Sequence, residues 1–454
     1  MKIKLFTGLT IEIDDSSCTA TIIKSKHPKT HLYIPSSVII NNKAYSLIKI
    51  NDYAFANTHI KSIRFANNSQ IKKFGKGIFD KSTIQSLSIP DSLEELDEEW
   101  CKGTDTLTKI LISSNNKRFS YIENKILVNN QTNTLVFARR DLTELTVPSN
   151  IVRIGQYSFA HCSKLQGVTF PEDSKLQSIR ANAFFYSSIK TINIPSELQD
   201  LADTWCLQSN CLSELTISPS NTIFTYLDNK YLINKALKSL VFVRKDIEEA
   251  EIPADLLKIG NNAFAFCMKL KTVTFQDPVK CKIEELGDNA FSFCIKLESF
   301  GELPRSVKRI GRGCFSTCKH LQAINIPANS ELRVIGEGAF QRCSIHKLFI
   351  PAKVSVLEEG WSKLAWNLDG IELSNENKNF ELIDDSYLVT KTDIPILIYA
   401  SYALENATIP SKVQKIGKNS FSYHYKLRNV SFFSDPNSYQ TSLVEIGDEA
   451  FMQK

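Results

Sequence analysis

The chain has 454 residues, more than one hydrophobic core usually serves, so either several domains or an array of repeats is required. Hydrophobic residues make up 43% and charged residues 23%, an ordinary globular composition that gives no case for a disordered or fibrous protein. Lysine and arginine total 54 against 49 aspartate and glutamate, and a net charge of +5 over this length does not argue for nucleic acid or an anionic membrane.

The N-terminal residues 1–48 are expected to form a strand-rich starting region. The opening "MKIKLFTGLTIEIDD" has only a short apolar run, interrupted by Thr7 and Gly8 and ended by Glu12, so it fails as a secretory signal. No window approaches 18 continuous apolar residues, and the C-terminal "DEAFMQK" has neither a hydrophobic tail nor a lipidation motif. We therefore expect no membrane span.

From residue 49 to residue 454 one short phrase recurs, as in "IGQYSFAHC", "IGNNAFAFC" and "IGEGAFQRC". Its aromatic anchors lie 21 to 30 residues apart within runs, and each has enough apolar area to fill the inside of one coil. The anchors are Phe55, Phe79, Phe159, Phe184, Phe264, Phe291, Phe315, Phe340, Phe421 and Phe451, with Trp100, Trp205 and Trp361 in the same position.

A second phrase, L-x-x-I-x-I-P, follows the anchors, as in "LQGVTFP", "IKTINIP" and "IHKLFIP". Its apolar residues alternate with a polar one, which is typical of a half-buried strand, and proline ends that strand. The glycine of I-G suits a tight bend. A single coil cannot bury its own apolar side, so the coils must stack. The sequence predicts a mainly-β repeat solenoid with a parallel strand ladder joined by short turns or helical pieces.

Three longer units near residues 100–148, 205–253 and 361–410 interrupt this pattern. Nineteen residues after each tryptophan anchor comes Phe119, Phe224 or Phe380, which opens a segment that reads as two short strands around an Asn- or Asp-containing turn. We expect these insertions to widen the coil like a hairpin.

The repeated phrases resemble the BspA-type leucine-rich repeats, whose hallmark is I-G-x-x-A-F-x-x-C-x-x-L-x-x-I-x-I-P. Residues 259–275 ("IGNNAFAFCMKLKTVTF") and 335–351 ("IGEGAFQRCSIHKLFIP") are close copies. Proteins with these repeats occur as surface antigens of oral bacteria and in anaerobic protist parasites. The resemblance implies a leucine-rich-repeat solenoid at the cell surface that binds host matrix proteins, host cells or other microbes, without catalysis.

The sequence departs from that pattern in having no signal peptide, no anchor and no recognisable terminal cap. It ends three residues after Phe451, in mid-repeat, so we expect the last coil to be completed or covered by something else. The missing export features favour the cytoplasm, so both locations stay open.

Eleven cysteines do not point to a metal or disulfide framework. Five lie three residues after an anchor, where stacking would align them in a buried ladder: Cys162, Cys267, Cys294, Cys318 and Cys343. The sharpest zinc candidate is "CFSTCKH", with Cys314, Cys318 and His320, but it lacks a converging fourth ligand, and repeat positions account for both cysteines. Cys206 and Cys211 flank an anchor in the same way. No nucleophile–base set, P-loop or zinc-protease motif occurs, so we expect neither catalysis nor any metal or cofactor.

The polar face of the strands is the remaining candidate binding surface. Phe349 is distinctive because it is apolar where its counterparts are polar, and it either anchors a partner or is buried by a neighbouring coil. The candidate residues are Arg64, Thr169, Asn193, Thr274, Asn325, His346 and Phe349.

These patterns favour a non-enzymatic surface antigen or adhesin-like protein that binds a protein partner, such as a host matrix or cell-surface protein. The alternative is an intracellular protein-interaction scaffold without a surface role, which the missing export features and free-looking thiols favour. An enzyme ranks third, because no converging polar constellation is visible.

Overall fold

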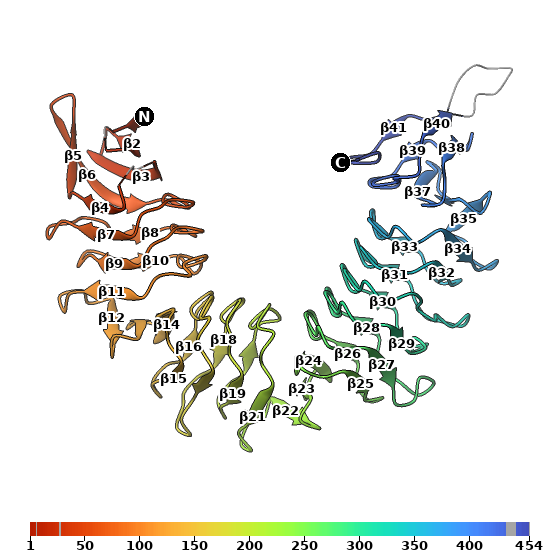
Figure 1. The fold of residues 1–454 in the computed structure, drawn as a ribbon, viewed down its shortest axis with the longest axis horizontal. Coiled ribbons are helices and arrows are strands. Elements are labelled where there is room, and N and C mark those ends of the chain that lie inside the picture. Colours follow the sequence, from red (N-terminus) through yellow and green to blue (C-terminus); the bar gives the residue numbers. More distant parts are fainter. Residues whose placement is uncertain (6, 27–28, 433–441, 454) are drawn as a thin grey trace. The chain divides into compact units, whose positions relative to one another are not determined.

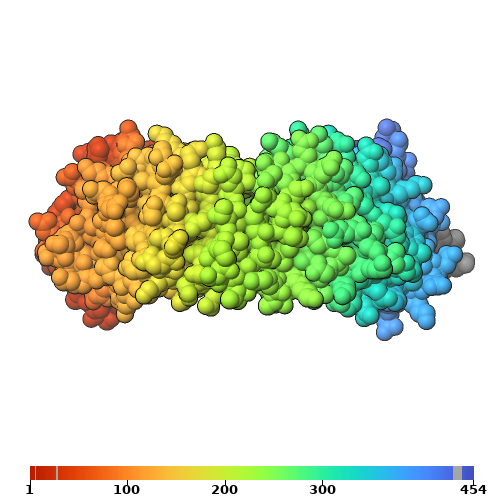
Figure 2. Space-filling model, turned by 90° about the horizontal axis from the view of Figure 1, so that it is seen from below, coloured from red at the N-terminus to blue at the C-terminus, as the bar shows by residue number. Residues whose placement is uncertain are grey.

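The computed structural model describes residues 1–5, 7–26, 29–432 and 442–453, which form strands and turns without any helix. The predicted mainly-β solenoid is therefore confirmed, but turns stand where short helical pieces were allowed for. The chain divides into two compact units, Met1–Ile223 (unit 1) and Phe224–Lys454 (unit 2). Within each unit the coils are stacked in chain order (Figure 1), and in the space-filling view the surface colours of each unit follow the same order (Figure 2).

Unit 1 begins with antiparallel strands that lead into the first parallel coils. Leu9, Ile11 and Ile13 are buried in the same core cluster as Phe55, so this antiparallel segment covers the start of the core. The expectation that no cap is present is wrong here, because alternation in "LTIEID" buries one face of a strand that belongs to no repeat. The sheet comprises β1 (Lys2–Lys4), β2 (Leu9–Asp14), β3 (Thr19–Ser25), β5 (Ser37–Ile40), β6 (Lys43–Ile50), β8 (Lys73–Phe74) and β10 (Glu95–Leu96).

The L-x-x-I-x-I-P phrases form a separate parallel sheet, which we call the long-strand sheet. In unit 1 it has two parts, separated by an insertion. The first part comprises β4 (His31–Ile34), β7 (Ser62–Phe65), β9 (Ser86–Ile89) and β11 (Lys109–Ile112). The second comprises β15 (Glu144–Thr146), β17 (Gly167–Thr169), β19 (Thr191–Ile194) and β21 (Glu214–Ile217).

The insertion of unit 1 contains three antiparallel strands, one more than the two predicted. Its first turn spans residues 123–125, where Glu123 and Asn124 have φ of 51° and 54° and the Lys125 N–H donates to the carbonyl of Ile122 at 2.9 Å, as in a type I′ turn. The third strand was missed because it also joins the parallel short strands of the following coils. This sheet comprises β12 (Phe119–Ile122), β13 (Ile126–Asn129), β14 (Thr134–Ala138), β16 (Arg153–Ile154), β18 (Ser178–Ile179) and β20 (Asp200–Leu201).

Unit 2 repeats this plan, with one hairpin at its start and another near its C-terminal end. Its first hairpin sheet comprises β22 (Phe224–Leu227), β23 (Tyr231–Asn234), β24 (Ser239–Val243), β26 (Lys258–Ile259), β28 (Glu285–Leu286), β30 (Arg309–Ile310), β31 (Val334–Ile335) and β33 (Val356–Leu357). The second comprises β35 (Phe380–Ile383), β36 (Tyr387–Thr390), β37 (Ile396–Ala400), β39 (Lys415–Ile416) and β41 (Glu445–Ile446). The long strands are β25 (Glu249–Ile252), β27 (Thr272–Phe275), β29 (Ser299–Phe300), β32 (Lys347–Ile350), β34 (Gly370–Leu373), β38 (Asn406–Ile409) and β40 (Asn429–Phe432).

The anchor aromatics occupy the inside of the coils. Every anchor from Phe55 to Phe421 is at most 1% exposed, whereas Phe451 is half-buried. Neighbouring rings stack, with centroids 4.7 Å apart for Phe264 and Phe291 and 4.8 Å for Phe159 and Phe184. Full burial of such a side chain contributes about 1.5–3 kcal/mol, which makes this ladder a main source of stability.

The glycine of I-G is required by the close approach of two coils. A Cβ at Gly311 would lie 2.5 Å from the backbone carbon of Gly287, nearer than any real contact. Gly311 does open a turn, because its carbonyl accepts the Cys314 N–H at 3.3 Å, but its φ is not left-handed, so the absence of a side chain serves the approach of the coils. The left-handed residue comes two positions later, at Asn289 or Gly313, where asparagine and glycine tolerate that conformation.

Candidate functional site

The long-strand sheet exposes one side chain per strand while the flanking residues enter the core. Arg64, Thr169 and Thr274 are exposed at the third position of a strand, between two buried apolar residues. The pleat of a strand turns alternate side chains to opposite faces, so these residues share the outer face of their sheets. We call this surface the strand face.

Some polar residues of the strand face are used to join coils. The amide of Asn193 accepts a hydrogen bond from the backbone N–H of Phe170 at 2.8 Å and donates one to its carbonyl at 2.7 Å. The Ser88 hydroxyl accepts from the N–H of Phe65 at 3.2 Å. Asn193 is half-buried, and its amide is already hydrogen-bonded to the backbone at the end of β17.

The remaining candidates in unit 2 lie less regularly. Asn325 is exposed but belongs to no strand, because residues 321–327 leave the ladder between β29 and β32. His346 is exposed just before β32. Phe349 lies opposite Glu372 and is half-buried against the core, so it is neither a free aromatic anchor nor a fully covered one.

Two hollows lie along β15, β17, β19 and β21 of unit 1. The first, of about 730 Å³, is bounded by Glu123 and Lys125 at the hairpin turn and includes Thr169. The second, of about 510 Å³, follows the strand ends and includes Asn193 and Thr216. Two of the predicted residues therefore line hollows of the size that a side chain or a short peptide occupies.

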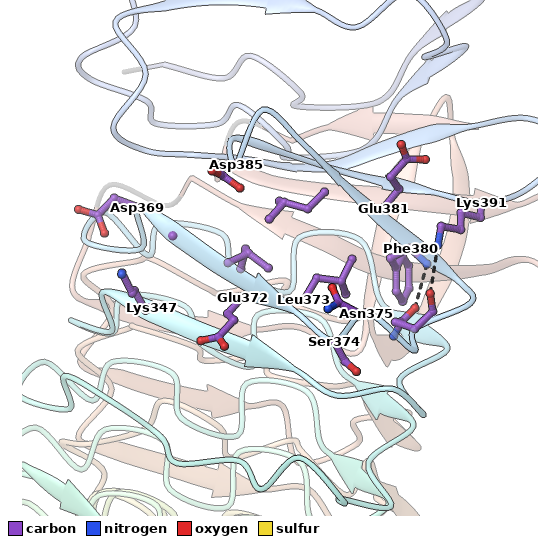
Figure 3. A pocket seen from close by; sticks show the side chains of 14 residues that line it. Lys347, Asp369, Glu372, Leu373, Ser374, Asn375, Phe380, Glu381, Asp385 and Lys391 are labelled. Carbon is purple, nitrogen blue, oxygen red and sulfur yellow. Dashed lines mark hydrogen bonds between the residues drawn. The ribbon is translucent and has the colours of Figure 1, made fainter.

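A third hollow, of about 700 Å³, lies in unit 2 between β34 and the hairpin strand β35 (Figure 3). Glu372 lies on the β34 side and Glu381 on the hairpin side (Figure 3), and Leu382 of the hairpin also lines the hollow. Sequence reasoning missed this site because it depends on where the hairpin folds relative to the strand. Its charged side chains are Asp369, Glu372, Glu381 and Asp385, with Lys347 and Lys391.

The profile of the BspA type leucine rich repeat region matches this sequence in six copies, over residues 36–134, 130–245, 235–361 and 392–454. The chain belongs to this family. No curated protein sequence matches it.

Solved structures similar to this BspA-type repeat protein include three bacterial proteins. A leucine rich cell surface protein from Faecalibacterium prausnitzii is 17% identical, with 98% of this chain and 97% of that chain covered and a TM-score of 0.46. A leucine-rich repeat protein from Eubacterium ventriosum is 20% identical, with 77% and 96% covered and a TM-score of 0.45. The pneumococcal vaccine antigen PcpA is 13% identical, with 96% and 99% covered and a TM-score of 0.37.

The ladder cysteines of the BspA-type repeat act as small hydrogen-bond donors. The Cys318 thiol donates to the carbonyl of Phe291, the anchor of the preceding coil, at 3.1 Å, and the Cys294 thiol donates to that of Phe264 at 3.2 Å. In another coil Thr58 occupies the same position and donates to a carbonyl of its own turn. Burial raises the pKa of both thiols well above its usual value, so they carry no reactive thiolate near neutral pH.

The part of the chain that the structure describes contains no cluster of metal-binding side chains. No group of three or more His, Cys, Asp or Glu side chains there could hold an ion. Cys314 and Cys318 are buried, and all eleven cysteines are free thiols.

Among the described residues, no helix has the length and apolarity to cross a membrane.

Two buried cations were missed by sequence reasoning. Arg140, 2% exposed, donates to backbone carbonyls of two neighbouring coils, including Thr104 at 2.9 Å and Ser158 at 2.8 Å. Lys245, 6% exposed, occupies the matching place in unit 2 and donates to the carbonyl of Ala265 at 2.9 Å. The sequence feature that could have revealed them is the recurrence of "FARRDL" and "FVRKDI" in two insertions, where the second basic residue stands directly before an acidic one.

Proposed function

We propose that the chain is a non-enzymatic binding protein that holds a partner protein on its strand face. The observation that carries this proposal is a row of solvent-facing side chains, such as Arg64, Thr169 and Thr274, on strands whose other side chains build the core. Repeat solenoids present such broad surfaces to partner proteins. The hollows beside the hairpins add depth, and polar backbone and side-chain groups line them.

A surface antigen or adhesin-like role, with a host matrix or cell-surface protein as partner, follows from the family resemblance. The second candidate function is an intracellular interaction scaffold. Its specific support is that all eleven cysteines are free and only Cys18 and Cys211 are exposed, a state that a reducing compartment maintains without a disulfide framework.

Labelling intact cells that make the protein with a membrane-impermeant amine reagent separates these two roles. A tagged protein in cells whose cytoplasmic markers stay unlabelled supports the surface role. An untagged protein that becomes tagged only after lysis supports the scaffold.

Binding itself is tested with the purified full chain against a panel of extracellular matrix proteins and intact host cells. The variant Thr169→Arg with Thr274→Arg places two bulky cations on the strand face and should weaken binding at least tenfold. The control variant Gln177→Arg with Gln199→Arg adds the same charge at exposed sites beside β18 and β20, on the other sheet. Equal loss in both variants, or saturable binding unaffected by either, contradicts a strand-face site.

A further inference from the structure

Each hairpin interrupts the long-strand sheet and leaves strands with one unpartnered edge. In unit 2, β34 pairs with β32 on one side only, and the next long strand, β38, pairs with β40. The N–H groups of Gly370 and Ser374 donate to carbonyls of the β32 side, at His346 and Ile350. Because successive residues of a strand direct their backbone groups to opposite sides, those of Ile371 and Leu373 face away from β32.

Tyrosines of the hairpins close some of these edges. The Tyr387 hydroxyl accepts a hydrogen bond from the N–H of Thr408, on the free edge of β38, at 3.0 Å. In unit 1 the buried hydroxyl of Tyr121 faces the N–H of Ile110, on the free edge of β11, without reaching good hydrogen-bond geometry. Such covering is how native proteins keep edge strands from pairing with other chains.

The edge of β34 has no such cover. Leu382 stands at the hairpin position that Tyr121 occupies in unit 1, and it offers no polar atom. Within the described part of the chain, the backbone groups of Ile371 and Leu373, which face away from β32, have no hydrogen-bond partner. The 700 Å³ hollow lies along this open edge, with the β34 backbone from Gly370 to Ser374 in its lining (Figure 3).

Unit 1 also has a strand edge that no hairpin tyrosine covers, on the strand that follows its hairpin. Ile126 replaces the tyrosine that Tyr387 supplies in unit 2, so the N–H of Thr146 on the free edge of β15 has no hydroxyl facing it. The 730 Å³ hollow includes β15 and the hairpin turn at its free edge, and it extends over β17 to Thr191 of β19. An apolar residue in place of a hairpin tyrosine therefore accompanies a hollow in both units.

The charges around both hollows favour a basic ligand. In unit 2 four carboxylates and two ammonium groups line the hollow. The Glu381 carboxylate is already paired with Lys412, and Lys391 donates to the carbonyl of Asn377 at 3.1 Å, so three carboxylates, two of them Glu372 and Asp385, remain. In unit 1 three carboxylates line the hollow with one ammonium group, Lys125, which pairs with Glu123. Each hollow holds an excess of negative charge that attracts a cationic segment.

We propose that the open edges of β34 and β15 each pair with an extended, basic peptide segment of a partner protein. The segment would add one strand to the sheet, exchange backbone hydrogen bonds with Ile371 and Leu373 or with Thr146, and place lysine or arginine side chains beside the carboxylates. Strand addition of this kind takes affinity from the main chain and selectivity from side chains. The inference rests on the proposed protein-binding function and specifies how the partner is held.

The test titrates the full chain with an acetylated, amidated eight-residue peptide of alternating lysine and valine, in 0.15 M NaCl, by isothermal titration calorimetry. The expected stoichiometry is two peptides per chain. Leu382→Tyr should reduce it to one, as should Ile126→Tyr, and the double variant should lose binding at least tenfold. Both substitutions introduce the residue found at the matching position of another hairpin, so they are compatible with the fold.

The control probe is the same peptide with an N-methyl group on every residue, which keeps its charge but leaves no backbone N–H on either edge to donate to a strand. Equal binding of both peptides, or full binding to the double variant, overturns the inference and leaves charge attraction alone. The peptide comparison needs only the wild-type chain, so it decides the question even if a variant fails to fold. Strand-face variants that weaken partner binding while neither peptide binds would refute edge pairing and leave the proposed function standing.

Discussion

Replacing the buried cation Arg140 tests how far backbone carbonyls hold the coils of unit 1 together. The guanidinium donates to the carbonyls of Thr104 and Ser158 at 2.9 and 2.8 Å, and to those of Ala138, Tyr157 and Cys101 at 3.2 to 3.4 Å. No carboxylate is among these acceptors. Arg140→Met keeps most of the volume but removes every donor.

The cost follows from the two short bonds. Hydrogen bonds that involve a charged group contribute about 1.5–3 kcal/mol each, so their loss amounts to roughly 3–6 kcal/mol. The neutral variant also avoids the desolvation cost of a buried cation, several kcal/mol, and this gain offsets part of the loss of hydrogen bonds. We expect Arg140→Met to lower the free energy of unfolding of unit 1 by about 2–4 kcal/mol, and Arg140→Lys to lower it by less, because lysine serves this position in unit 2 as Lys245.

The matched control is Arg139→Met, one residue away. Arg139 is partly exposed and pairs with Asp141 at 2.6 Å, a surface ion pair of about 0–1 kcal/mol. Urea unfolding followed by tryptophan fluorescence, together with amide hydrogen exchange over residues 101–162, measures both variants. A loss for Arg140→Met below about 1 kcal/mol, or no larger than that of Arg139→Met, would refute this account of the buried cation.

Three further predictions concern titration and reactivity. Nine of the eleven thiols are buried, so the native chain should react with an aromatic disulfide reagent at Cys18 and Cys211 only; reaction of more than two thiols before unfolding contradicts this. Burial raises the pKa of Tyr121 and Tyr231 to about 12, so the contribution of these two tyrosines to stability should be constant below about pH 10 and fall above it as the unfolded chain ionises first; alkaline urea titrations of the chain and of Tyr121→Phe with Tyr231→Phe measure this, and equal profiles between pH 10 and 12 oppose it. Burial lowers the pKa of His424 below 6.5, so its contribution should be complete above that pH and decline in more acid solution; the decline should vanish in His424→Cys, and hydrogen exchange over residues 400–427 reports it.

The periodic features of the fold follow from the sequence alone. Anchor spacing, strand alternation and the proline that ends each phrase are local properties, and repetition multiplies each one, so the solenoid and the outward position of Thr169 or Thr274 could be read without coordinates. The same local reasoning placed the I-G glycine at a turn but could not show why glycine is required there. A Cβ at Gly311 would lie 2.5 Å from the backbone carbon of Gly287 in the neighbouring coil, a contact that no single repeat reveals.

Only the tertiary structure decided what happens between coils. Which strand edge is covered depends on whether a hairpin places Tyr387 or Leu382 against it, and the two positions lie on different faces of one insertion. The burial of Arg140 among carbonyls likewise arises from two coils that meet around it. A periodic sequence determines the coil, because each coil repeats the same local interactions. The sites arise where an insertion breaks the period, and there the contacts are between residues that are distant in the chain.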